Sequence, residues 1–68
     1  MKVYRDKYDR LICDSDLLKF DNSKVFIFKM IGERAVLLSK ERFVLLNADR
    51  ICYDNKFYSA IIETIENN

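Results

Sequence analysis

The centre of the chain carries the clearest pattern of apolar and polar positions. Residues 24–31 have the sequence Lys-Val-Phe-Ile-Phe-Lys-Met-Ile, and such β-branched and aromatic runs are typical of strands. Gly32-Glu33 follows, and glycine in the first central position favours a type II′ hairpin turn, which needs a positive φ there. Residues 34–39 return as a second strand, and residues 42–47 form a third after a polar turn. The pattern predicts a three-stranded antiparallel β-meander.

The hairpin also predicts which residues share a face of this sheet. A two-residue turn places Met30 opposite Ala35 and Phe28 opposite Leu37. Continuing the alternation gives one face with Phe26, Phe28, Met30, Ala35, Leu37, Val44 and Leu46. The other face has Val25, Ile27, Ile31, Val36, Leu38, Phe43 and Leu45, with Lys29, Arg34 and Lys40 among them. A sheet with one solvated face alternates apolar and polar residues, so two largely apolar faces indicate that both need cover.

The C-terminal segment is predicted to provide one of these covers. Its apolar residues recur at helical spacing, at Phe57, Tyr58, Ile61, Ile62 and Ile65. This predicts an amphipathic helix over about residues 55–66, with Asp54 or Asn55 as its N-cap. The alternative is a hairpin around Asp54-Asn55, because isoleucine and aromatic residues favour strands. The hairpin would place Glu63 on the apolar face, so the helix fits the pattern better.

The N-terminal third supports two interpretations. Tyr4, Tyr8, Leu11 and Ile12 fit one face of a helix, whereas residues 3–4 and 11–13 equally fit two short strands. Asp14-Ser15-Asp16 resembles the cap of a helical turn. The type of this element stays open. The predicted fold class is α+β: the meander, a C-terminal helix and this N-terminal element.

Composition places the chain among small globular proteins. Its 68 residues predict a single domain spanning 1–68, with half of the residues apolar and a net charge of +1. The first ten residues are charged throughout with no apolar segment after them, and a membrane span needs about 20 apolar residues. We therefore expect a cytoplasmic protein without membrane contact, whose Cys13 and Cys52 are reduced.

Few side chains are suited to catalysis or metal binding. The chain has no histidine, which removes the usual proton shuttle and leaves two cysteines where a structural zinc site needs four donors. Asp14-Ser15-Asp16 is followed by apolar residues rather than by further calcium ligands. The single glycine cannot form a phosphate-binding loop. We expect no enzyme activity, no cofactor and no metal.

Three short segments resemble two known families. Residues 25–32 resemble the first strand and turn of the bacterial Sm-like RNA chaperones, and residues 57–65 loosely resemble their last strands. Leu37 replaces the glycine of that family, and Ser59 and Ala60 replace its Lys-His pair for RNA contact. Residues 43–51 are similar to a stretch in a family of short flagellum-associated bacterial proteins.

Charge is distributed unevenly and suggests where a partner binds. Residues 24–42 carry five basic and two acidic side chains, whereas residues 43–68 carry two basic and four acidic ones. We expect a protein-binding module with a regulatory, inhibitory or assembly-forming role. The candidate contact residues are Lys29, Arg34, Val36, Leu38, Lys40, Arg42, Phe43 and Leu45.

An uncovered apolar face also predicts self-association. We expect a homodimer through the face with Val36, Leu38, Phe43 and Leu45, because closed two-fold pairing is the commonest way to bury such a face. One alternative is a small RNA- or DNA-binding module that uses the basic hairpin 24–42. Another is a structural subunit of a larger assembly.

Overall fold

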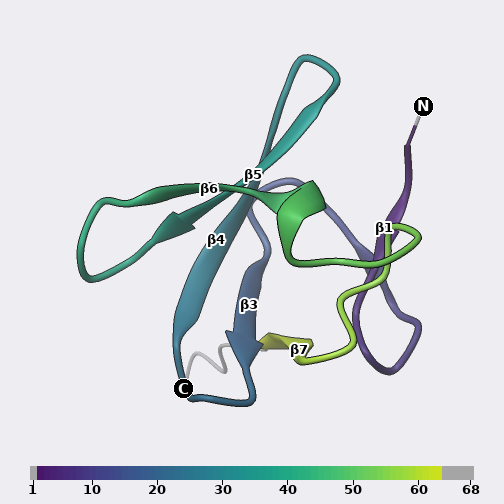
Figure 1. The fold of residues 1–68 in the computed structure, drawn as a ribbon, viewed down its shortest axis with the longest axis horizontal. Helices are drawn as coiled ribbons and strands as arrows, with labels where there is room; N and C mark the ends of the chain where they lie inside the picture. Colours follow the sequence, from purple (N-terminus) through teal and green to yellow (C-terminus); the bar gives the residue numbers. More distant parts are fainter. Residues whose placement is uncertain (1, 64–68) are drawn as a thin grey trace, which may run out of the picture.

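The computed structural model describes residues 2–63, which form two antiparallel sheets and one short 3-10 helix (Figure 1). A two-stranded sheet pairs β1 (Tyr4–Arg5) with β2 (Leu11–Ile12). A five-stranded sheet has the order β6-β5-β4-β3-β7. Its strands are β3 (Leu17–Phe20), β4 (Val25–Ile31), β5 (Arg34–Ser39), β6 (Leu45–Asn47) and β7 (Ala60–Glu63). The 3-10 helix η1 (Ala48–Arg50) follows β6.

The predicted hairpin and its register are confirmed. Met30 pairs with Ala35 and Phe28 with Leu37. Of the two turn residues only Gly32 has a positive φ, at 63°, as a type II′ turn requires. The third strand begins at Leu45 rather than at residue 42. The Ser39 hydroxyl accepts the amide N–H groups of Glu41 and Arg42, and this wider turn delays the strand.

The predicted α+β class with a three-stranded sheet is wrong, because the sheet has five strands and no helix forms over residues 55–63. Residues 64–66 of the expected helix lie outside the described range. Asp54 and Asn55, the expected N-caps, both have positive φ and form a tight turn between Tyr53 and Lys56, as in a type I′ turn. The turn of the alternative hairpin therefore forms. The strand beyond it, β7, pairs with β3 instead, with Leu18 opposite Ile62.

The N-terminal third is made of strands. The Asp14-Ser15-Asp16 segment is a turn rather than a helix cap, since Asp16 accepts the Cys13 N–H at 2.7 Å and Asp14 accepts the Met30 N–H at 2.7 Å. These two hydrogen bonds stabilise the turn that precedes β3, and β3 pairs with β4.

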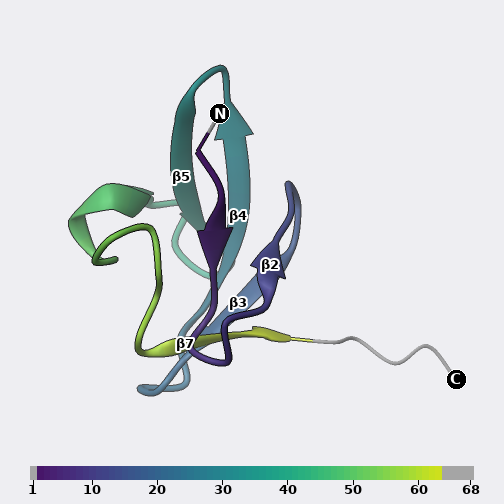
Figure 2. The ribbon, with the colours of Figure 1, turned by 90° about the vertical axis from the view of Figure 1, so that its right-hand side faces the viewer.

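The hydrophobic core lies on one face of the five-stranded sheet, here called the inner face. The β1–β2 sheet and residues 48–57 cover this face, and Figure 2 shows β1 in front of β4 and β5. The Tyr4 ring lies 5.4 Å from that of Phe28, and Phe57 packs against both. The buried cluster comprises Tyr4, Ile12, Leu18, Phe28, Ala35, Leu37, Ala48, Phe57 and Ala60.

A fully buried carboxylate joins the N-terminal segment to β7. Asp6 accepts the N–H groups of Tyr8, Arg10 and Ile62 at 2.9–3.0 Å and the Nε–H of Arg10 at 2.8 Å. Burial alone raises the pKa of Asp6, but the hydrogen bonds from Ile62 and Arg10 and the Arg10 charge outweigh it, so the pKa is lowered. Asp6 is therefore buried as a charged group.

Candidate functional site

The opposite face of the five-stranded sheet, here called the outer face, carries a row of apolar side chains. The strand pairings place Leu45 beside Leu38, Leu38 beside Ile27, and Ile27 beside Leu17. Neither η1 nor the β1–β2 sheet packs on this face, because both contribute to the cluster on the inner face. Among the described residues the row has no covering layer: Leu45 is 62% exposed, and Leu17, Ile27 and Leu38 are half-buried.

Charged residues on the outer face are mostly basic. The outward positions of the five strands include Lys19, Lys29 and Arg34, against the single carboxylate of Glu63. Lys29 pairs with Asp14 at 3.4 Å. Within residues 2–63 no ion pair engages Lys19 or Arg34. The face therefore combines an apolar row with unneutralised positive charge. Further apolar residues at its outward positions are Val25, Ile31, Val36 and Ile61.

The structure brings five of the eight predicted contact residues onto this face. Lys29 pairs with Val36 and Leu38 with Leu45, while Arg34 begins β5. The other three, Lys40, Arg42 and Phe43, lie in the exposed loop between β5 and β6. Phe43 is 85% exposed and has a φ of 53°, an unfavourable conformation for a bulky residue.

Sequence reasoning missed the outward residues of β3 and β7. Leu17 and Lys19 belong to a segment whose type was open, and Ile61 was assigned to a helix. The alternation in Leu17-Leu18-Lys19-Phe20 was the available signal, with Leu18 fully buried and Lys19 exposed.

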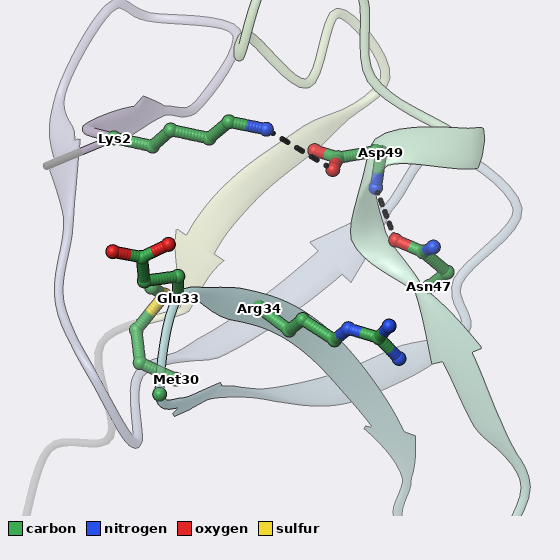
Figure 3. Close-up of a pocket in the computed structure, with 7 residues that line it drawn as sticks. Lys2, Met30, Glu33, Arg34, Asn47 and Asp49 are labelled. Carbon is green, nitrogen blue, oxygen red and sulfur yellow. Dashed lines mark hydrogen bonds and ion pairs between the residues drawn. The ribbon is translucent and has the colours of Figure 1, made fainter.

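A hollow of about 690 Å³ lies at the turn end of the β4–β5 hairpin and opens beside η1 (Figure 3). Asp49 accepts the Tyr4 hydroxyl at 2.6 Å and pairs with Lys2 at 3.5 Å. The Tyr4 hydrogen bond lowers the pKa of Asp49, while burial and this carboxylate raise that of Tyr4. Both Asp49 oxygens are engaged, which does not suit a catalytic base. The hollow is lined by Lys2, Met30, Gly32, Glu33, Arg34, Asn47 and Asp49.

Both cysteines are free thiols. Cys13 is exposed, and burial raises the pKa of the half-buried Cys52, which disfavours its reactive thiolate. Within residues 2–63 no three Cys, Asp or Glu side chains are grouped so that they could hold a metal ion.

No protein-family model, curated protein or solved structure matches this chain. In the described part of the chain no helix has the length and hydrophobicity needed to span a membrane.

Proposed function

We propose that this chain is a cytoplasmic, non-enzymatic protein-binding module that docks its partner on the outer face. The observation that carries the proposal is the apolar row Leu17, Ile27, Leu38 and Leu45, which crosses four adjacent strands without cover among the described residues. Contiguous exposed apolar surface is unusual on monomers and is typical of interfaces. A regulatory, inhibitory or assembly-forming role fits such a surface.

The charge of the outer face favours an acidic partner. Lys19 and Arg34 have no ion pair within residues 2–63, so carboxylates of a partner can pair with them at the rim of the apolar row. Two copies of the chain would instead bring like charges together. The homodimer through Val36, Leu38, Phe43 and Leu45 is thus the less favoured form of the same proposal.

Matched variants test the proposal in binding assays with extract of the native cell. Ile27→Glu places a carboxylate in the apolar row, whereas Tyr53→Glu changes an exposed residue in the segment that covers the inner face. We expect wild type and Tyr53→Glu to retain one acidic protein, and Ile27→Glu to lose it. Thermal melting checks that each variant folds. Equal retention by all three chains would contradict the proposal.

The same assay separates the alternatives. Loss of all bound material after nuclease treatment, with binding that falls steeply as salt rises, would favour nucleic-acid binding through the basic hairpin 24–42. Retention of a second copy of the chain would favour a homodimer over an acidic partner. Light scattering that gives a large assembly of fixed size would favour a structural subunit.

A further inference from the structure

We infer that the free edge of β6 accepts an extended strand from a protein partner, with apolar residues in the strand and acidic residues flanking it. This inference rests on the proposed protein-binding function and adds a second contact beside the outer face. It follows from a difference between the two edges of the five-stranded sheet, formed by β7 and β6.

The β7 edge is closed by the N-terminal segment. The N–H of Lys7 donates to the C=O of Ala60 at 2.8 Å. The N–H of Ile62 donates to Asp6 at 3.0 Å, and the C=O of Ile62 accepts from Arg10 at 3.2 Å. An incoming strand would have to displace these bonds.

Within residues 2–63 the β6 edge has no such cover. The N–H of Ser39 donates to the C=O of Val44. Hydrogen-bonded and non-hydrogen-bonded pairs alternate along antiparallel strands. Leu46 therefore bonds to β5, and the N–H groups of Leu45 and Asn47 point away from β5. In the described chain no hydrogen bond uses these two N–H groups. A row of unpaired backbone groups is a template for strand addition.

The surroundings of this edge suit apolar side chains. A hollow of about 420 Å³ is lined by Leu45, Leu46, Asn47, Arg50 and Ile51. Val44 is 45% exposed and Ile51 is 39% exposed. Because side chains alternate across a strand, an added strand would extend the apolar row on one face and fill this hollow on the other.

Basic residues at both ends of β6 favour acidic residues on either side of the partner strand. Arg42 precedes β6 and Arg50 follows it, and neither has an ion pair within residues 2–63. The loop residues Lys40, Glu41 and Arg42 together carry a net charge of +1, and Asp49 is held by Tyr4 and Lys2.

This charge distribution also argues against pairing with a second β6. An antiparallel pair of β6 strands centred on Leu46 would place Arg42 of one copy opposite Arg50 of the other. Pairing centred on Leu45 would place Lys40 opposite Arg50. Either register brings like charges together, so an acidic-flanked segment of another protein is the occupant.

Asn47→Pro tests the edge directly. Asn47 has φ −71° and ψ 120°, which proline adopts, so the substitution removes the outward N–H without backbone strain. Asn47→Ala is the matched control, because both variants lose the side-chain bond to the Asp49 N–H and only proline loses the backbone donor. The probe is a peptide of alternating threonine and valine with two glutamates at each end.

Calorimetric titration should show peptide binding to wild type and Asn47→Ala, and binding about tenfold weaker to Asn47→Pro. The same peptide with lysine flanks should also bind more weakly. Equal binding by both Asn47 variants, preference for lysine flanks, or no binding to wild type would overturn the inference. Ile27→Glu separates the two proposals, since Ile27 lies two strands from β6. This variant should lose outer-face docking and keep peptide binding.

Discussion

The carboxylate of Asp6 shows how one buried charge can organise a small β protein. It accepts four hydrogen bonds, three from the neighbouring residues Tyr8 and Arg10 and one from Ile62, which lies 56 residues away in sequence. It occupies a position on the β7 edge where a neighbouring strand would otherwise provide an acceptor. This side chain thus stabilises the attachment of the N-terminal segment that covers the core.

Replacing Asp6 should destabilise the fold. Asp6→Asn keeps the shape but presents amide hydrogens to N–H donors, and it leaves Arg10 without its buried partner. We expect a loss of about 2–4 kcal/mol in the free energy of unfolding. The control is Asp9→Asn, whose exposed carboxylate has only a 3.9 Å ion pair with Lys56 and should cost under about 0.5 kcal/mol. Urea denaturation measures both, and similar losses would contradict this role for Asp6.

The charge of Asp6 also predicts how stability depends on pH. Its folded pKa lies below the unfolded value of about 4, so its contribution is present above that value and is lost as pH falls through the folded pKa. Asp14 and Asp49 have lowered pKa values and act in the same direction. We expect the free energy of unfolding to fall between about pH 5 and pH 2. Asp6→Asn should reduce this slope, and an unchanged slope would assign the pH dependence to other groups.

At the scale of elements, the β4–β5 hairpin was predictable because local signals agreed. Gly32 suits the turn, and the flanking residues alternate around it. The C-terminal strand was not predictable in this way. Its isoleucines fit both a helical period and a strand, and the choice depends on pairing between Leu18 and Ile62, which no local pattern reveals.

The turns were also hard to predict from the sequence. Non-glycine residues occupy positive φ at Asp9, Ser15, Ser23, Phe43, Asp54 and Asn55, so glycine did not mark these turns in the sequence. Asp and Asn tolerate this conformation better than most residues, but the exposed Phe43 does not. A strained aromatic beside β6 is consistent with a side chain retained for contact with a partner.

Phe43→Gly should separate stability from binding. Relief of the positive φ should raise the free energy of unfolding by about 0.5–1 kcal/mol, after allowance for the greater entropy of glycine in the unfolded chain. Partner binding should weaken. Ser23→Gly is the control, because Ser23 has a φ of 69° in another turn and should give a similar gain in stability without loss of binding. Denaturation and calorimetry report the two effects, and unchanged binding by Phe43→Gly would remove Phe43 from the interface.

At the scale of the whole molecule, other segments cover the inner face of the five-stranded sheet, whereas no described segment covers the outer face. The alternation around Phe28 and Leu37 indicated that both faces are apolar and placed Leu38 opposite the core. The segments that cover the inner face could not be predicted in this way, because long-range contacts such as those of Tyr4 with Phe28 and Phe57 hold them there. Four of the eight candidate contact residues, Lys29, Arg34, Val36 and Leu38, could be placed on the outer face from the hairpin alone, and Leu45 followed from the third strand. The contributions of Leu17 and Ile61 required the tertiary structure.

Site-specific photocrosslinking tests whether the partner docks on the outer face. A photoreactive phenylalanine analogue replaces Leu38 in the apolar row or, in a second chain, the exposed Tyr53 in the segment that covers the inner face. After irradiation in native extract, we expect one crosslinked acidic protein from the Leu38 position and none from the Tyr53 position. Crosslinks from Tyr53 alone, or equal crosslinks from both positions, would contradict the outer face as the docking surface.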